Sequence, residues 1–197
     1  MLEGRTVSLE AELYLGEGPQ LGERAFVLVA DLLREVKLTN KIQKTQFLQT
    51  GRFPIIDQSE NFIAGYWNEE KDVFRVTEPL VLFGDHTRRF KYVDFDFVLG
   101  ADGVKVLRFD ARVLPRFAYF ALCALKLRNL GYSRHYKELL GHEIPLPPLE
   151  EQQRIVAEIE GYQKDIDRLE SEIATNRERI QRVLDRVWGN GTKDDEP

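Results

Sequence analysis

The feature that most limits how this chain can fold is a series of apolar residues that recurs at alternating intervals of four and three residues near the C-terminal end. The series begins at Ile155 and ends at Val187. Such spacing is typical of the a and d positions of a coiled coil, and a seam about 50 Å long needs a second helix to bury it. The sequence therefore predicts a long coiled-coil helix over 147–189. The residues expected to line its seam are Ile155, Ile159, Tyr162, Ile166, Leu169, Ile173, Asn176, Ile180, Val183 and Val187.

The charges beside this seam indicate how the helix pairs. The g positions are acidic in the first half, as at Glu158 and Asp165, and basic in the second half, as at Arg179 and Arg186. An antiparallel copy places Glu158 opposite Arg186 and Asp165 opposite Arg179, whereas a parallel copy places both Asn176 side chains in one layer. Each exposed ion pair contributes only about 0.5 kcal/mol, so the charges select the orientation while the apolar seam supplies the affinity. A solvent-facing helix packed on its own domain is the disfavoured alternative.

The overall composition restricts the class of protein. One cysteine among 197 residues excludes a disulfide framework and an all-cysteine zinc site. The longest apolar run has nine residues against the roughly 20 that cross a bilayer, and no secretory signal is expected, so the predicted location is the cytoplasm. The net charge of −5 belongs to the part after residue 140, and the nearly neutral remainder is compatible with DNA binding if its basic residues cluster.

The chain divides into four segments by pattern. Residues 1–24 are expected to be irregular, 25–146 to form a globular domain, 147–189 the helix, and 190–197 a disordered tail. Within the domain we expect a short helix from Asp31 to residue 36, with Asp31 as its N-cap, and a longer helix over 115–129 in which Cys123 is buried. The expected strands lie at 52–56, 72–77, 79–83, 91–99 and 104–109, and Asp102-Gly103 is expected to turn the fourth back onto the fifth. The fold class is α+β, a mixed, largely antiparallel sheet with short helices followed by one long coiled-coil helix.

Motifs of catalysis are scarce. The sequence contains no phosphate-binding glycine loop, no His-Glu-x-x-His motif and no histidine spacing suited to a metal, so no metal site is expected. Asp57, Glu69 and Lys71 resemble the acid and lysine set of a magnesium-dependent nuclease, which stays open as a disfavoured alternative.

Polar side chains that suit a DNA duplex gather in three short segments. Amides of Gln and Asn read adenine edges, Arg reads guanine, and Lys or Arg hold phosphates. The candidate DNA-binding residues are Lys41, Gln43, Lys44, Gln46 and Gln49 in the first segment, Thr87, Arg88, Arg89 and Lys91 in the second, and Tyr132, Ser133, Arg134 and His135 in the third.

The segment GHEIPLPPLEEQQRIV at 141–156, followed by the heptad helix, resembles the conserved region of the specificity subunits of type I restriction-modification enzymes. The segments GRFPIIDQ at 51–58, VLFGDHT at 81–87 and GADG at 100–103, together with Gly65-Tyr66, resemble motifs of a target recognition domain in the same family. These subunits usually carry two recognition domains and two long helices that pair antiparallel, whereas this sequence has one of each. The resemblance therefore implies a half-length subunit that pairs with a second copy or with another specificity half.

The same resemblance implies which partners carry out the chemistry. It places methylation with S-adenosylmethionine on a modification subunit and ATP- and Mg-dependent cleavage on a restriction subunit. This chain is then expected to hold no cofactor, to catalyse nothing, and to bind double-stranded DNA. A coiled-coil adaptor without a DNA role remains the other alternative.

Overall fold

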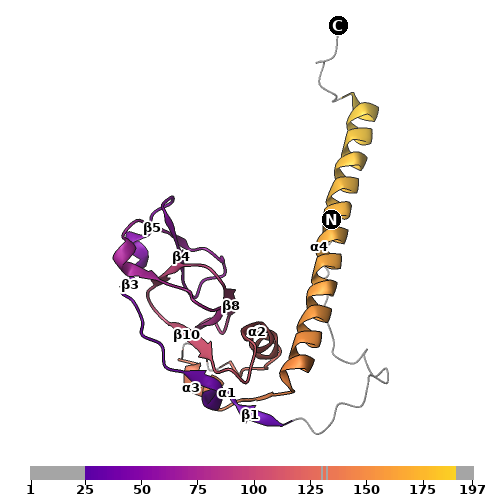
Figure 1. The fold of residues 1–197 in the computed structure, drawn as a ribbon. Helices are drawn as coiled ribbons and strands as arrows, with labels where there is room; N and C mark the ends of the chain where they lie inside the picture. Colours follow the sequence, from indigo (N-terminus) through magenta and orange to yellow (C-terminus); the bar gives the residue numbers. More distant parts are fainter. Residues whose placement is uncertain (1–24, 130, 132, 190–197) are drawn as a thin grey trace.

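The computed structural model describes residues 25–129, 131 and 133–189. A globular part carries a long helix, α4 (Leu149–Trp188), which extends away from it (Figure 1). The expectations for 1–24 and 190–197 lie outside the described residues. The division between 146 and 147 stays a prediction, with α4 beginning two residues later.

The first sheet of the globular part is antiparallel throughout. Its strands, in spatial order, are β2 (Leu33–Arg34), β10 (Val104–Phe109), β7 (Leu80–Gly84) and β8 (Phe90–Val93). Side chains alternate between the two faces of a strand, so Val81 and Phe83 of β7 pack in one core cluster while Leu80 and Leu82 pack in another. Strands β7 and β10 therefore separate two layers of the core. Both lie where the apolar runs at 79–83 and 104–109 predict strands.

The second sheet is centred on a fully buried strand, β9 (Phe97–Gly100). Strands β3 (Lys41–Ile42) and β4 (Phe53–Ile56) pair with β9 in parallel, and β6 (Val73–Phe74) pairs with it antiparallel. A further strand, β5 (Gly65–Trp67), pairs with β4 antiparallel. The structure is thus mixed and largely antiparallel, as expected.

The strand predicted over 91–99 and the turn predicted at Asp102-Gly103 were wrong, and the strand predicted over 72–77 is reduced to β6. The run 91–99 is not one strand, because the chain leaves β8 after Val93 and enters β9 at Phe97 in the other sheet. At this crossing the Asp96 carboxylate accepts hydrogen bonds from the Val76 backbone N–H at 2.8 Å and the Arg75 guanidinium at 2.7 Å. Consequently Asp102-Gly103 does not close a hairpin, since β9 and β10 belong to different sheets.

The helices of the globular part are shorter than predicted. Helix α1 (Val29–Leu32) starts before Asp31 and stops at Leu32 because β2 begins at the next residue and pairs with β10. Helix α2 (Pro115–Cys123) starts with Pro at its first position, as expected, but ends at Cys123, whose side chain is exposed and not buried. Helix α3 (Tyr136–Leu140) leads into β11 (Glu143–Pro145), which pairs antiparallel with β1 (Phe26–Leu28).

The start of α4 is fixed to the globular part by a buried glutamine. The Gln152 side chain is fully buried, its Oε1 accepts from the Leu114 N–H at 2.8 Å, and its Nε2 donates to the carbonyls of Arg112 and Pro147. About two helical turns further on, an ion pair of 2.8 Å joins Glu160 to Arg116 of α2. These contacts determine the direction in which α4 leaves the domain.

Candidate nucleic-acid interface and pairing helix

Two of the three segments that carry candidate DNA-binding residues meet at Asp85, directly after β7. The Asp85 backbone N–H donates to the Gly103 carbonyl at 2.7 Å, and its own carbonyl accepts from the His135 N–H at 2.9 Å. Its buried carboxylate accepts from the Tyr136 N–H at 2.7 Å and lies 3.9 Å from the Lys105 ammonium. We call this set of contacts the Asp85 junction. It joins the β7–β8 loop, the β9–β10 loop and the start of α3.

The first polar segment reaches the same region only through Lys41. The Lys41 ammonium donates to the Val104 carbonyl at 3.0 Å, and burial, followed by the nearby charge of Lys105, lowers the pKa of Lys41. Next to it a short 3₁₀ turn, η1 (Lys44–Gln46), is capped reciprocally by the side chains of Gln43 and Gln46. The side chains of the segment that are exposed are Gln43, Lys44, Gln46 and Gln49.

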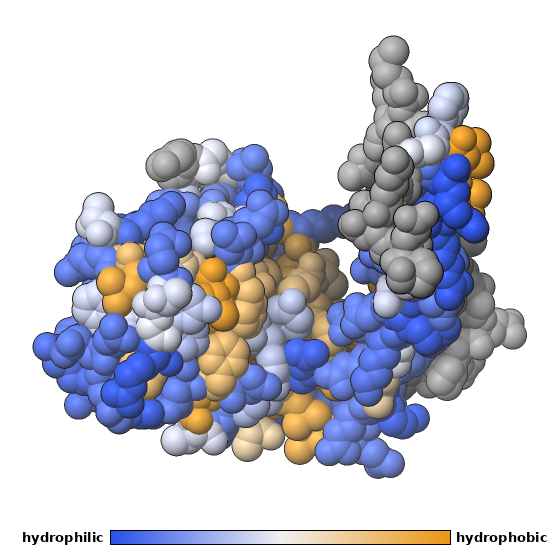
Figure 2. Space-filling model, turned by 90° about the horizontal axis from the view of Figure 1, so that it is seen from above, coloured by the Kyte–Doolittle hydropathy of each residue, from blue (hydrophilic) through white to orange (hydrophobic). Residues whose placement is uncertain are grey.

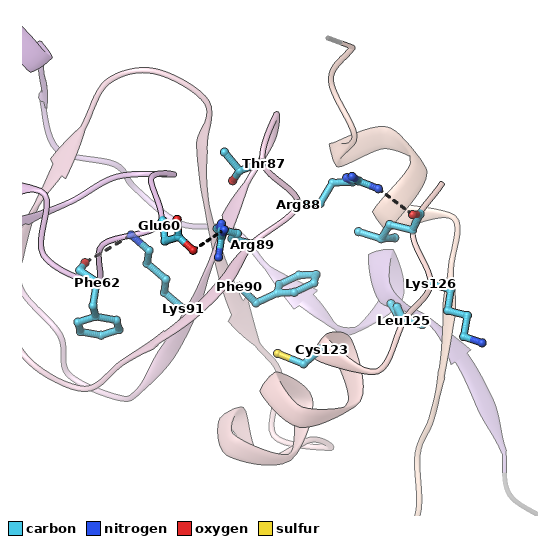
Figure 3. Close-up of a pocket in the computed structure, with 11 residues that line it drawn as sticks. Glu60, Phe62, Thr87, Arg88, Arg89, Phe90, Lys91, Cys123, Leu125 and Lys126 are labelled. Carbon is cyan, nitrogen blue, oxygen red and sulfur yellow. Dashed lines mark hydrogen bonds and ion pairs between the residues drawn. The ribbon is translucent and has the colours of Figure 1, made fainter. Parts of the chain in front are cut away.

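The second segment borders an open cavity of about 560 Å³ (Figure 3). Thr87, Arg88 and Arg89 line it from the chain after β7, and Lys126 belongs to the chain that follows α2. The Arg88 backbone is left-handed, with φ of 57°, and its guanidinium donates to the Leu127 carbonyl at 3.2 Å. That bond ties the β7–β8 loop to the chain after α2 and gives the cavity a rim of basic groups.

The aromatic rings of Phe62 and Phe90 line the same cavity. Arg89 is partly neutralised there, because its guanidinium forms an ion pair of 3.0 Å with Glu60. The cavity therefore combines cationic groups with flat apolar faces, a combination that suits a phosphate backbone and the bases attached to it.

The structure places two of the predicted DNA-binding residues in the interior. The Lys91 ammonium is buried and donates to the backbone carbonyls of Asp57 at 2.8 Å, Asn61 at 2.6 Å and Phe62 at 3.4 Å. Burial lowers the pKa of Lys91, with Asp57 opposing this effect. His135 is fully buried at the Asp85 junction, with Nδ1 2.9 Å from the Asp85 carbonyl. Both side chains hold loops together, so we exclude them from the interface.

The third segment supplies exposed groups at Ser133 and Arg134, whereas Tyr132 lies outside the described residues. Arg134 borders a second hollow of about 560 Å³ together with Arg128 and Lys137. The sequence reasoning missed Lys126, Arg128 and Lys137. Lys126 and Arg128 fall within the helix expected over 115–129, whereas α2 ends at Cys123 and leaves both on the chain that follows it.

The nuclease alternative finds no support in the geometry. Asp57 is buried, where its carboxylate accepts from the Ser59 N–H and hydroxyl and lies 4.0 Å from the Lys91 ammonium. Glu69 and Lys71 are exposed around another 3₁₀ turn, η2 (Glu70–Asp72), and not on a central strand. Over residues 25–129, 131 and 133–189, no cluster of three or more His, Cys, Asp or Glu side chains is placed to hold a metal ion.

The seam of α4 is exposed over most of its length. In Figure 2 orange apolar side chains stand out on an otherwise blue helix. The first two seam residues are a partial exception, because Ile155 packs against the core of the globular part and Ile159 lines a cavity beside α2. The large apolar seam side chains that remain exposed are Tyr162, Ile166, Leu169, Ile173, Ile180, Val183 and Val187.

The length and polarity of a helix decide whether it could cross a membrane. In the described part of the chain, none of the helices combines the length and the apolar character that crossing a bilayer demands.

Comparison with known proteins identifies the family of this fold. The family model for the type I restriction modification DNA specificity domain matches residues 29–177. The chain belongs to this family. The matched region of this specificity domain contains the Asp85 junction, the basic loops and the first three quarters of α4.

Individual relatives agree with this assignment. The specificity subunit of the type I restriction enzymes EcoR124I and EcoR124II from Escherichia coli is 26% identical over 125 residues, which is 56% of this chain and 31% of that protein. A structure that concerns complex assembly and conformational transition of the type I R-M system aligns with a TM-score of 0.65 at 20% identity, over 88% of this chain and 47% of the other. The HsdS subunit of Thermoanaerobacter tengcongensis aligns with a TM-score of 0.58 at 18% identity, over 94% and 49%.

The S subunit of M. genitalium aligns with the same TM-score of 0.58 at 18% identity, over 83% of this chain and 45% of that one. These structural likenesses concern the fold, the expected α+β domain with a long helix. The chain spans less than half the length of each of these relatives.

Proposed function

We propose that this chain is a DNA sequence-recognition subunit of a type I restriction-modification system, and that it reads one half of a bipartite site. The observation that carries the proposal is the family match over 29–177, which joins one recognition domain to one long helix. The subunit directs chemistry and performs none. S-adenosylmethionine, ATP and Mg²⁺ belong to the modification and restriction subunits that it would steer in the cytoplasm.

The DNA face of the proposed subunit is formed by the loops around the two basic hollows. Arg88 and Lys126 border the first hollow, and Arg134 and Lys137 border the second. The Asp85 junction joins the β7–β8 loop to the start of α3, and the bond from Arg88 to the Leu127 carbonyl joins that loop to the chain after α2. Cationic groups clustered in this way attract a phosphate backbone even though the whole chain is acidic. Thr87 and Ser133 add hydroxyl groups, and the exposed Gln side chains at 43, 46 and 49 add amides that can read base edges.

The DNA face is tested by binding of the protein, with the modification subunit present, to a random duplex library followed by selection of bound sites. An inverted repeat with a fixed spacer is expected. Arg88→Ala and Arg134→Ala should each weaken binding and reduce the dependence of log K on log salt by about one unit. Lys164→Ala, an exposed change far along α4, serves as the control. Unchanged binding of both arginine variants at fixed salt would remove these loops from the interface, and no binding to the pool at all would favour the adaptor alternative.

The exposed seam supports the second half of the proposal, an antiparallel pair of α4 helices that holds two recognition domains a set distance apart. Six apolar seam positions after Ile159, from Tyr162 to Val183, are about half exposed in the single chain. A patch of this length on a soluble helix is typical of an interaction surface. A second copy, or another specificity half, would cover it.

Sedimentation tests this pairing. Ile166→Asp/Ile173→Asp places charges in the seam and should give a monomer. Ser171→Asp/Thr175→Asp adds the same charge on the outer face of the same heptads and should sediment like the parent. If both double variants sediment like a dimeric parent, the interface lies elsewhere.

A further inference from the structure

An apolar cavity of about 230 Å³ lies in the angle between α2 and the first turns of α4. Phe117, Phe120 and Ala121 line it from α2, and Ile155 and Ile159 line it from α4. Pro145 and Pro147 complete its lining. The cavity opens to solvent beside the exposed seam, so an apolar group from a neighbouring molecule would remove its walls from water.

The other end of α4 carries two apolar side chains that the seam does not explain. Leu184 and Trp188 are 44% and 77% exposed, although neither occupies an a or d position. In the heptad register they fall at e and b, and because they are four residues apart they lie together on one flank of the helix. A plain two-stranded coil would leave the indole of Trp188 largely in water.

The antiparallel register brings these two features together. When Val187 of one copy lies opposite Ile155 of the other, Leu184 and Trp188 lie level with residues 158 and 154, at the cavity. The e and b positions that Leu184 and Trp188 occupy at the end of α4 also correspond to the flank of α4 that faces the cavity at its start. Val156 at e packs in the core cluster that includes α2, and Glu160 at b pairs with Arg116 of α2, so α2 covers the e and b flank at the start of α4. In an antiparallel pair the e flanks of the two helices face each other.

We propose that Leu184 and Trp188 of a second copy cover this cavity, so that each globular domain contacts the C-terminal end of its partner's α4. The proposal rests on the antiparallel pairing proposed above and adds a specific contact to it. At each end of the pair, three helices then pack together: α2 and the start of α4 from one copy, and the end of α4 from the other. It also fixes the register, because a slip of one heptad moves Leu184 and Trp188 about 10 Å along the helix and away from the cavity.

A double-mutant cycle between Phe120 and Leu184 tests the contact. Within one chain the helix separates Leu184 from Ile159 at the cavity by roughly 37 Å, so any coupling between Phe120 and Leu184 must pass between copies. We expect Phe120→Ala and Leu184→Ala each to raise the dimer dissociation constant about tenfold, and the double variant to raise it far less than the roughly hundredfold product. Phe120→Ala combined with Ile173→Ala in mid-seam is the control pair and should be additive.

Quenching of Trp188 fluorescence provides a test that leaves the cavity intact. In a Trp67→Phe background Trp188 is the one remaining tryptophan of the 197-residue chain. Its emission should shift to shorter wavelength and resist acrylamide at concentrations where the protein is a dimer, and both effects should vanish on dilution. A dimer in which Trp188 stays accessible and the Phe120–Leu184 cycle is additive overturns this contact while leaving the pairing intact. A protein that stays monomeric at all concentrations overturns both.

Discussion

The carboxylate of Asp85 accepts a hydrogen bond of 2.7 Å from the backbone N–H of Tyr136, which lies 51 residues further along the chain. The bond crosses from the end of β7 to the first residue of α3. Because the Asp85 backbone also bonds the β9–β10 loop and His135, one residue fixes two segments proposed to meet DNA, the β7–β8 loop and the start of α3, to the β9–β10 loop. A rigid scaffold that presents variable loops is a common solution for recognition surfaces.

Asp85→Ala should lower the free energy of unfolding by about 2–4 kcal/mol and weaken DNA binding without removing a basic group. The substitution leaves the Tyr136 N–H without its acceptor and removes the charge near Lys105, in a site where Asp85 is only 1% exposed. Urea unfolding and duplex titration measure the two effects. Asp94→Ala, at an exposed carboxylate, should stay within about 0.5 kcal/mol of the parent. Equal stability of the two variants would show that the junction does not hold the loops.

Lys91→Met should destabilise the fold and leave the salt dependence of DNA binding unchanged. The methionine fills the space of the lysine stem, but three backbone carbonyls lose the ammonium that satisfies them. A loss of about 2–4 kcal/mol in urea unfolding is expected. A DNA-contacting lysine would behave in the opposite way, with stability kept and the slope of log K against log salt reduced by about one unit.

Local sequence patterns predict the positions of most strands and of α4, whereas they do not predict which strands pair with each other. The apolar runs predict β7 and β10 correctly, because such runs are buried whatever their partners are. The heptad repeat predicts the bounds of α4 to within two residues. The sheet to which β9 belongs depends on the distant strands β3 and β4, and no turn motif beside β9 encodes that choice. Hence the sequence pattern predicts one strand over 91–99, where the structure has the end of β8 and most of β9.

The candidate site was predictable to a similar degree. Arg134 is exposed in the polar loop before α3, as such loops usually are, and Arg88 is half-buried in the β7–β8 loop. Their contact with DNA stays a prediction. Lys91 was misassigned, although the alternation of β8 contains the answer: Lys91 is two residues before buried Val93 and therefore shares its face. His135 carried no such pattern, since its burial arises from Asp85, fifty residues away along the chain.

Acid should destabilise this protein partly through Asp72. Its carboxylate accepts from the Asn40 amide at 2.8 Å and from the Trp67 indole at 3.0 Å, and the Asn40 bond, assisted by Trp67, lowers the pKa of Asp72 despite its burial. A carboxyl group whose pKa is lower in the folded state stabilises the fold above its unfolded pKa, and this stabilisation is lost as the pH falls through the folded value. The free energy of unfolding should therefore decrease between about pH 5 and about pH 2.

Asp72→Asn removes this titrating group and should make the acid side of the stability profile flatter than that of the parent, as measured by urea unfolding at a series of pH values. Asp94→Asn, at an exposed carboxylate, is the control. The Asp72 variant will retain part of the slope, because hydrogen bonds from Arg75 and Arg112 lower the pKa of Asp96 and Asp110 respectively. A profile for Asp72→Asn that parallels the parent would contradict the assignment.

The direction of α4 should depend on Gln152 far more than on its neighbour Gln153. Gln152→Leu leaves the Leu114 N–H and the carbonyls of Arg112 and Pro147 without the amide that satisfies them, whereas Gln153 is exposed. We expect Gln152→Leu to lower the free energy of unfolding by about 2–3 kcal/mol and to speed hydrogen exchange at the Leu114 N–H, with α4 still helical by circular dichroism. Gln153→Leu should change neither quantity.

If α4 sets the distance between two recognition domains, then weakening the hydrogen bonds of Gln152 that attach α4 to its domain must also make that distance more variable. Selection of bound sites with Gln152→Leu should then return the same half-site sequences with a broader range of spacers, because the DNA face is untouched while the helix tilts more freely. An unchanged single spacer, together with parent-like exchange at Leu114, would show that the ion pair of Arg116 with Glu160 and the packing of Ile155 are sufficient to orient the helix.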